Sequence, residues 1–246
     1  AKLTRQDLIK VLEFCEDCLS CASEKKLHPR ILQFADYMGF EFVLYAYQKH
    51  SYQKEGTVEF VNLSNPLEWM DEYHAKNYLL DDPVRIELEL RLDKEGSDSS
   101  ILWDAYDRRL SAREKKIIER RSSFDLRRGF SVFDNSVPRS SMFLISFASK
   151  RQRVDERSQN MGRIIVPHLN RCRKRLDLLV LVNRLTEKER LVARWIAEGK
   201  TNWEIAKILS VSTRTVKFHA ANIFQKLGVA GRQGASAILL AVRFLS

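Results

Sequence analysis

The sequence has no apolar run that is long enough to cross a membrane. A spanning helix needs about 18 or more consecutive apolar residues, and no segment of the 246-residue chain approaches this length. The first residues, Ala1-Lys2-Leu3-Thr4, also lack the apolar stretch of a secretory signal. We therefore expect a cytoplasmic protein without a membrane partner.

Signatures of catalysis and of metal binding are also missing. The chain has no G-x-S-x-G motif, which would place a nucleophilic serine at a sharp turn. Its five histidines are scattered without the spacing of metal ligands; they are His28, His50, His74, His168 and His219. We therefore predict no catalytic residues, no metal and no cofactor, and an enzyme is the least favoured class.

Cysteine is scarce, with only four residues. In a reducing compartment these thiols are not expected to form disulfides. Cys15, Cys18 and Cys21 form a C-x-x-C-x-x-C pattern that can hold a metal or an iron–sulfur cluster, but Cys172 is far away in the sequence. Leucines share the helical face of Cys15, so buried thiols are the favoured interpretation and a metal or redox role is the alternative.

Positive charge, by contrast, is abundant. The chain has 42 Lys and Arg against 32 Asp and Glu, which gives a net charge of +10 and a pI near 9.5. Such a balance favours a polyanionic partner, most commonly nucleic acid, although an anionic membrane surface would also suit it. The length allows one large and one small domain.

Two short helices joined by a tight turn are predicted between Thr201 and His219. An apolar stripe at helical spacing marks the first helix, and we expect Val211 to fill the turn. Ser212 and Thr213 are good N-cap residues for the second helix. Its outer face is basic and polar, as in a helix-turn-helix that enters the major groove of DNA. A small helical bundle with a solvated basic face is the alternative.

Within the second helix, Lys217 is the best candidate for a contact with base edges, because lysine can donate to guanine O6 and N7. Phe218 is expected in the core, and His219 either contacts phosphate or lies half-buried against the first helix. Polar and basic neighbours suit phosphate contacts. The predicted DNA-binding residues are Lys200, Thr201, Ser212, Thr213, Arg214, Thr215, Lys217, His219, Asn222 and Lys226.

A single motif of this size makes few contacts, so we expect a homodimer on a palindromic site in double-stranded DNA. The last helix has an apolar face that would serve either pairing with a second copy or packing inside the domain. That face consists of Ile238, Leu239, Val242 and Leu245.

The remaining pattern predicts an α+β protein. Helices are expected at residues 4–23, 28–39, 66–77, 111–123 and 156–181, with a further helix from Asp82-Pro83 and a break at Pro167. Strands are expected at 40–47, 57–62, 130–134 and 142–148. This order predicts an N-terminal α/β/α sandwich with a mostly antiparallel sheet, followed by a C-terminal four-helix helix-turn-helix domain. The capping box Thr186…Glu189 places the domains at 1–177 and 185–246, with a linker at 178–184.

Trp69, Tyr73, Asp82 and Trp103 bring together a hydroxyl, two indole N–H groups and a carboxylate. Inside an aromatic-walled cavity these groups would bind one small ligand, with the donors on carbonyl oxygens and the carboxylate on an amide N–H. The alternative is that the aromatics are ordinary core residues and that Asp82 only caps a helix.

Both regions resemble one family. Leu185–Arg190, Glu204–Ala206, Thr215–His219 and Lys226–Val229 resemble the DNA-binding domain of LuxR-type transcription regulators. Asn65–Trp69, Tyr73, Asp82–Val84 and Trp103 resemble the acyl-homoserine-lactone-binding domain of the same regulators. The similarity is greatest to SdiA-like members, in Tyr73–Asn77 and in Leu126–Gly129.

The resemblance implies a role for each pocket residue. Trp69 would donate to the lactone carbonyl, Asp82 would accept from the ligand amide, and Tyr73 would contact the acyl carbonyl. Trp103 would pack over the lactone ring, and Ser146 would lie near the acyl oxygen. The implied function is a quorum-sensing transcription regulator that binds an acyl-homoserine lactone, or a related small molecule, and then DNA.

Four positions of the first domain depart from the family pattern. Asn65 stands where an aromatic residue is usual, Arg85 where an apolar residue is common, Asp125 where glycine is usual, and Phe133 where proline is frequent. An unpaired charge in an apolar pocket costs several kcal/mol. Arg85 and Asp125 must therefore face solvent, form a pair or meet a polar ligand. The alternative to a lactone-binding regulator is an orphan regulator that binds a different small molecule or needs no ligand. A lactone hydrolase is the third hypothesis.

Overall fold

The computed structural model describes residues 2–51, 54–92, 98–106, 108–134, 136, 142–151 and 153–243. The chain divides into two compact units, one of residues 1–21 and 25–170 and the other of residues 22–24 and 171–246. The linker at 178–184 remains a prediction; residues up to Asn183 belong to a helix. Among the described residues, no helix is both long and apolar enough to cross a membrane.

A five-stranded antiparallel sheet lies at the centre of the first unit. Its strands are β1 (Phe42–Ser51), β2 (Lys54–Asn62), β3 (Ser100–Leu102), β4 (Arg128–Phe133) and β5 (Phe143–Ser149), in the order β2-β1-β5-β4-β3. Every neighbouring pair is antiparallel, which confirms the predicted fold class. The sequence did not predict β3, because three residues are too few to display an alternation of apolar and polar side chains.

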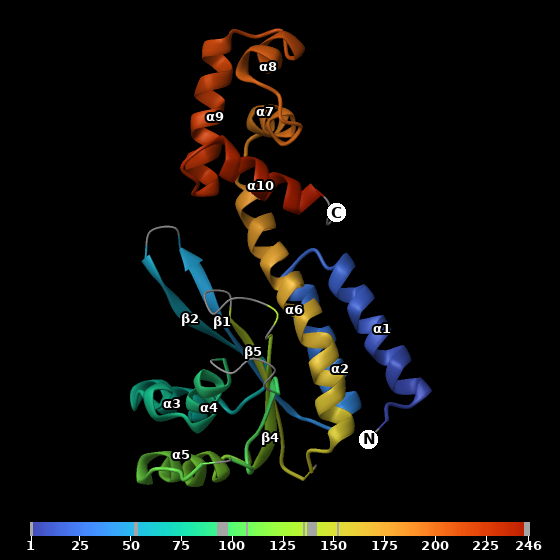
Figure 1. Cartoon of the computed structure of the whole chain (residues 1–246), viewed down its shortest axis with the longest axis vertical. Coiled ribbons are helices and arrows are strands. Elements are labelled where there is room, and N and C mark those ends of the chain that lie inside the picture. The colour runs from blue at the N-terminus through green and yellow to red at the C-terminus, as the bar shows by residue number, and fades with distance from the viewer. Residues whose placement is uncertain are drawn as a thin grey trace. The chain divides into compact units, whose positions relative to one another are not determined.

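Helices cover both sides of this sheet (Figure 1). On one side are α1 (Arg5–Ser20), α2 (Glu24–Met38) and the first part of α6 (Glu156–Asn183). On the other side are α3 (Leu67–Ala75), α4 (Pro83–Leu92) and α5 (Ala112–Ser122), with a short 3-10 turn, η1 (Tyr78–Asp81), between α3 and α4. The first unit is therefore the predicted α/β/α sandwich.

Strand β5 shows how both faces of the sheet are buried. Its residues are all buried, although successive side chains point to opposite faces. Leu144 and Ala148 belong to the apolar cluster with α3, α4 and α5, while Phe147 stacks on Phe130 and lies against Phe40. The strand consequently reads as a nearly continuous apolar run, with one polar interruption at Ser146.

Two prolines do not act as the sequence predicts. Helix α2 begins at Glu24, four residues before the predicted start, and contains Pro29; α6 continues through Pro167 without a break. A proline removes one backbone hydrogen bond and costs about 3 kcal/mol in a helix interior. The turns around Pro29 and Pro167 bury Ile31 and Val166 almost completely. Burial in the core therefore outweighs the lost hydrogen bond.

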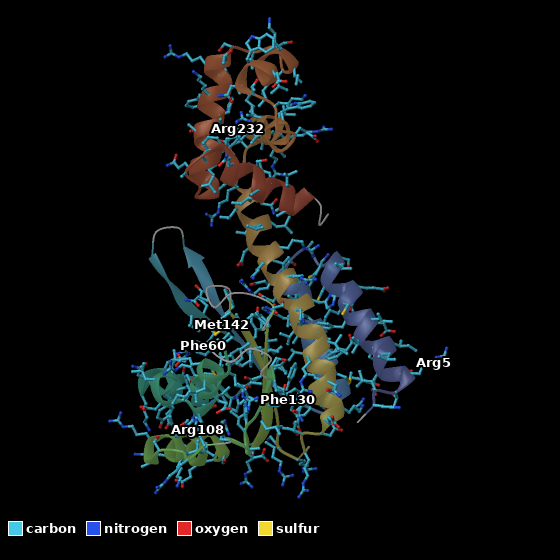
Figure 2. The ribbon with its side chains drawn as sticks, in the orientation of Figure 1. Arg5, Phe60, Arg108, Phe130, Met142 and Arg232 are labelled. Carbon is cyan, nitrogen blue, oxygen red and sulfur yellow. The ribbon has the colours of Figure 1, made fainter. Side chains whose placement is uncertain are left out.

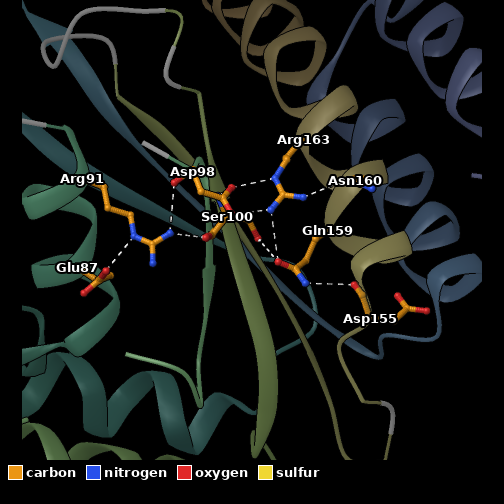
Figure 3. Close-up of polar contacts among 8 residues, drawn as sticks. All are labelled: Glu87, Arg91, Asp98, Ser100, Asp155, Gln159, Asn160 and Arg163. Atoms are coloured by element: carbon orange, nitrogen blue, oxygen red, sulfur yellow. Dashed lines mark hydrogen bonds and ion pairs between the residues drawn. The ribbon is translucent and has the colours of Figure 1, made fainter. Parts of the chain in front are cut away.

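A polar network holds the short strand β3 between α4 and α6 (Figure 3). Arg91 donates to the Glu87 carboxylate at 2.8 Å and to the Ser100 carbonyl oxygen at 2.6 Å. Arg163 of α6 donates to both carboxylate oxygens of Asp98, at 2.9 and 2.7 Å. Because Trp103 directly follows β3, this network fixes the position of a residue that is predicted to bind ligand.

The second unit contains α7 (Glu187–Ala197), α8 (Asn202–Ile208), α9 (Thr213–Leu227) and α10 (Arg232–Arg243). These are the four helices predicted from the sequence. Capping boxes start α7 at Thr186 and α8 at Thr201, and the Ser212 hydroxyl caps α9. The fully buried residues that hold the four helices together are Ile196, Ile205, Val216, Ile223 and Ala235.

Helix α5 supports a pH-dependence prediction. Glu114 pairs with Arg108 and accepts from the Ser111 backbone N–H at 2.7 Å. The Arg108 guanidinium lowers the pKa of Glu114 from 4.5 to about 2, although burial opposes this. A carboxyl group whose pKa is lower in the folded state than in the unfolded state stabilises the folded protein. This stabilisation is complete when the pH is above the unfolded-state pKa, and it is lost as the pH falls toward the folded-state pKa.

We therefore expect Glu114→Gln to destabilise the protein by about 1–3 kcal/mol at pH 7 and by less at pH 3.5. Urea unfolding at the two pH values measures the difference. Glu119→Gln, on the exposed face of the same helix, serves as the control. A difference for Glu114→Gln that did not change with pH would contradict the prediction.

Candidate functional site

A cavity of about 350 Å³ lies in the first unit, and the sheet, α3, η1, α4 and α5 contribute to its lining. All five residues that the sequence predicts for ligand binding line this cavity, and they come from separate parts of the chain. They are Trp69, Tyr73, Asp82, Trp103 and Ser146. The remaining wall is mainly apolar, as is typical of small-molecule sites. Phe60 and Met142 belong to it (Figure 2).

The carboxylate of Asp82 connects two walls of the cavity. Its Oδ2 accepts from the Tyr73 hydroxyl at 2.7 Å, and its Oδ1 accepts from the Val84 backbone N–H at 2.7 Å. The second bond is the helix cap predicted for Asp82. Burial and the nearby Asp82 charge raise the pKa of Tyr73 well above its usual value, so its hydroxyl stays neutral and remains a donor.

A second polar chain lies along the sheet. The indole N–H of Trp103 donates to the Ser131 hydroxyl at 2.8 Å, and Ser131 bonds to the Ser146 hydroxyl at 2.7 Å. Ser131 and Ser146 are paired neighbours on β4 and β5. Ser131 was not predicted from the sequence; its signal is a single hydroxyl between the apolar residues Phe130 and Val132.

Trp69 is only 4% exposed, yet its indole N–H makes no hydrogen bond to any described residue. Its ring lies against Tyr73, Tyr78 and Phe124, with ring centroids 5.6 to 5.8 Å away. Because Trp69 also lines the cavity, its N–H is a donor that a ligand acceptor can reach. Buried tryptophans usually have a partner for this group.

The two charged departures from the family pattern have different environments. Arg85 lines the cavity but pairs with Glu89 and donates to the Leu80 carbonyl oxygen at 2.8 Å. Asp125 is half exposed and pairs with Lys150 at 2.9 Å. Its φ of 65° is left-handed, and aspartate tolerates this conformation better than most residues. That backbone explains why glycine suits the position. The other two departures are Asn65, which lines the cavity, and Phe133, which is buried in the adjoining core.

Arg121 is a cavity residue that the sequence analysis did not find. It is 5% exposed, lines the cavity and lies over the Trp103 ring, 4.1 Å from its centroid. The basic residues of α5 read as an exposed face, and Arg121 lies among them in the sequence. The available signal is its spacing from Glu114 and Ile117, which are the other buried residues of α5.

In the second unit, the predicted DNA-binding residues lie along α9 and at the start of α8. Lys217 and Arg214 are exposed, whereas Thr213, Thr215, His219 and Asn222 are half-buried. Ser212 caps α9 by accepting from the Thr215 N–H at 3.0 Å. Thr201 caps α8, and Lys200 lies 3.9 Å from Glu204.

Lys226 differs from the other predicted DNA contacts. Its ammonium group donates to Glu189 at 2.6 Å and joins the last turn of α9 to the capping box of α7. Burial raises the pKa of Glu189, but Lys226 and Thr186 lower it by more, so the carboxylate is charged. Lys226 therefore contributes to the internal structure of this unit.

Two expectations about apolar residues need correction, and for the last helix the structure favours one of the two alternatives. Phe218 is 63% exposed rather than in the core, because it lies about 200° around the helix from Val216. Val211 is also exposed; the turn is closed by backbone, with a bond from the Val211 N–H to Ala206 and a left-handed Ser210. Ile238 and Leu239 are buried inside the domain, Val242 is half-buried, and Leu245 lies outside the described residues.

The helical face that Cys15 shares with Leu8, Leu12 and Leu19 is exposed rather than buried, so the expectation of buried thiols holds for Cys18 and Cys21 but not for Cys15. Cys18 and Cys21 are buried, and burial raises the pKa of the half-buried Cys15 thiol. A raised pKa disfavours the thiolate, which is the form that binds metals. In the part of the chain that the structure describes, no three potential metal ligands come together.

Comparison with protein families accounts for both units. Residues 23–170 match the autoinducer binding domain, and residues 183–239 match the bacterial regulatory proteins of the luxR family. The chain belongs to the LuxR family. It is therefore a transcription regulator of quorum-sensing type, with a domain for a small-molecule signal and a helix-turn-helix domain for DNA.

Individual relatives of this LuxR-family chain agree. It is 28% identical over 233 residues to the transcriptional activator VanR of Vibrio anguillarum, covering 92% of this chain and 93% of the relative. It is 30% identical over 170 residues to the regulatory protein SdiA of Escherichia coli, covering 66% of each. A crystal structure of that SdiA shares the fold, with a TM-score of 0.57, 22% identity and coverage of 97% of this chain and 99% of SdiA. A structure of SdiA in complex with octanoyl-rac-glycerol is also similar, with a TM-score of 0.55 and 21% identity. The match covers 100% of this chain and 98% of the SdiA chain.

The corrected position of Phe218 gives a stability prediction for this LuxR-family chain. Because the side chain is exposed, Phe218→Ala is expected to change the free energy of unfolding by no more than about 0.5 kcal/mol. Ile223→Ala, on the buried face of the same helix, is the matched comparison and should cost about 2–5 kcal/mol. Thermal unfolding measures both, and a similar loss for the two variants would show that Phe218 packs in the core.

Proposed function

We propose that this regulator binds an acyl-homoserine lactone in the cavity of its first unit and then binds a palindromic DNA site as a homodimer. The observation that carries the ligand proposal is the unpaired Trp69 N–H, which lines the same apolar cavity as the Tyr73–Asp82 pair. An amphipathic amide matches this combination, with its polar head on these groups and its acyl chain on the apolar wall.

Each polar group of the site has a complementary atom on such a ligand. The Trp69 N–H donates to the lactone carbonyl oxygen, and the Tyr73 hydroxyl donates to the acyl carbonyl oxygen. Asp82 accepts from the amide N–H; a carboxylate has about four lone-pair sites, and Tyr73 and Val84 occupy two of them. Trp103 packs over the ring, and Ser146 lies near the acyl oxygen.

Ligand binding is coupled to the amount of folded regulator by mass action. A ligand that binds only the native state at 100 times its Kd stabilises that state by about 2.7 kcal/mol. In a protein of this size such a gain raises the melting temperature by roughly 5–10 °C.

We expect the thermal shift with an acyl-homoserine lactone to be lost in Asp82→Asn, since an amide nitrogen at this position cannot accept the ligand N–H. Asp125→Asn is the control, because it removes a carboxylate that is half exposed and does not line the cavity. Differential scanning fluorimetry over a series of chain lengths measures the shift. No shift at any chain length would contradict the ligand proposal.

For DNA, Lys217 and Lys226 provide a matched pair. Lys217→Ala removes an exposed cation from α9 and is expected to weaken operator binding by about 10- to 100-fold, with little change in stability. Lys226→Met leaves the buried Glu189 without its partner, so it is expected to lower the melting temperature of the protein. Fluorescence anisotropy with a labelled operator and thermal unfolding separate the two effects; equal loss of DNA affinity without destabilisation would refute the distinction.

A second candidate is a regulator that answers a different small molecule. The observation in its favour is the buried guanidinium of Arg121 in the cavity wall. A neutral lactone ring does not need a cation beside it.

A further inference from the structure

Arg121 is a buried cation without an anionic partner among the described residues. Its Nε and Nη2 are inaccessible to solvent and form no hydrogen bond. It forms no ion pair with a described residue, because Glu72, Glu87 and Glu114 pair with Lys76, Arg91 and Arg108 instead. The residue nevertheless belongs to the cavity wall.

The known neighbours of Arg121 do not neutralise it. Trp103 offers only its ring face, a cation–π contact that is weaker than an ion pair. The Tyr106 hydroxyl is buried beside Arg121, and burial raises its pKa to about 12, so it carries no charge that could neutralise the guanidinium. A buried charge whose donors are unmet is costly unless it is paired and hydrogen-bonded.

The chemistry of the guanidinium selects its partner. Arginine presents a planar fork of N–H donors that matches the two oxygens of a carboxylate, and such pairs have the strongest charge-assisted hydrogen bonds. Asp82 is the carboxylate of the same cavity; it accepts from Tyr73 and Val84, and it makes no ion pair or hydrogen bond with Arg121. Since no described residue forms an ion pair with Arg121, a ligand that enters the cavity is positioned to supply the complementary carboxylate.

We propose that the regulator binds an N-acyl amino acid whose free carboxylate pairs with Arg121. The inference rests on the proposed function and specifies the head group at the same site. Asp82 accepts from the amide N–H, and the apolar wall takes the acyl chain. Trp103, which lies under the guanidinium, forms the floor beside the carboxylate. The two sources of this chemistry are a ring-opened acyl-homoserine lactone and an amino acid that is acylated directly.

The test uses the full chain and three octanoyl amides, with Kd measured by isothermal titration calorimetry. They are N-octanoyl-homoserine lactone, its ring-opened acid N-octanoyl-homoserine, and N-octanoylglycine. We expect the better of the two acids to bind at least tenfold more tightly than the lactone, as one charge-assisted pair provides. If the hydroxyl of the ring-opened acid contacts the protein, that acid binds more tightly than N-octanoylglycine. If only the carboxylate contributes, the two acids bind equally well.

Arg121→Met is the decisive variant, because it keeps a long apolar side chain and removes the charge. We expect it to abolish the preference for the acid while lactone binding persists, and Arg121→Lys to retain part of the preference. Arg113→Met is the matched control: it removes the same charge from the same helix, but its side chain is 80% exposed. This control should keep the wild-type preference.

Unfolding of the ligand-free variants checks that Arg121 is not structural. Removing an unpaired buried charge should leave the melting temperature of Arg121→Met equal to, or above, that of the wild type. A clear decrease would reveal a structural partner for Arg121 and would overturn the proposal.

The outcomes also separate this proposal from the broader one. If the lactone binds at least as tightly as both acids, and Arg121→Met does not change the ratio, the carboxylate proposal fails and the lactone proposal stands. If an acid binds and the lactone does not, the carboxylate proposal stands and replaces the lactone. If none of the three amides binds, both proposals are overturned.

Discussion

The carboxylate of Asp82 is the interaction on which the signal-binding unit depends. One oxygen holds the first turn of α4 through the Val84 N–H, and the other holds the Tyr73 hydroxyl of α3. These two short helices form one wall of the cavity. A residue that both caps a helix and faces a ligand connects local structure with binding, because any group that engages the carboxylate also acts on the two helices.

The sheet imposes the complementary constraint. Helices cover both faces of the sheet (Figure 1). Side chains on one face pack against α2 and α6, and side chains on the other face, called here the hollow side, point toward the cavity and α3, α4 and α5. On β1 and β5 the hollow side carries Ala46 and Ser146, which are small enough to leave space. The aromatic side chains Tyr45 and Phe147 of the same strands point to the other face. Side-chain size thus determines which face holds the cavity.

How much of this could be predicted from the sequence depended on whether the signal was local. The capping box at Thr186 and the polar face of α9 are local sequence patterns. Such patterns predicted the four C-terminal helices correctly. The prolines at 29 and 167 also give a local signal, but tertiary burial overrode it. Phe218 was misplaced because hydrophobicity alone does not tell which side of a helix a residue occupies.

The ligand site shows the same division. The five pocket residues were predicted mainly through the resemblance to a family, and the structure brings all of them to one cavity. Ser131 and Arg121 were not predicted, since their significance arises from contacts between segments that are distant in the sequence. Ser131 bridges Trp103 to Ser146 across two strands, and Arg121 meets Trp103 from α5. No short sequence window contains such a pair.

Basic residues illustrate why partners, rather than charge, decide function. Lys226 is satisfied by Glu189, so its charge supports the packing of α7 and α9. Lys217 is exposed on α9 and has no ion-pair partner among the described residues, so its charge remains available for DNA phosphates or bases. Arg121 is buried like a structural residue but unpaired like a binding residue. A protein interior does not retain such a charge without a use, because an apolar side chain of similar volume would generally be no less stable there. Among the described residues none pairs with this cation, which is why we propose a ligand carboxylate as its partner.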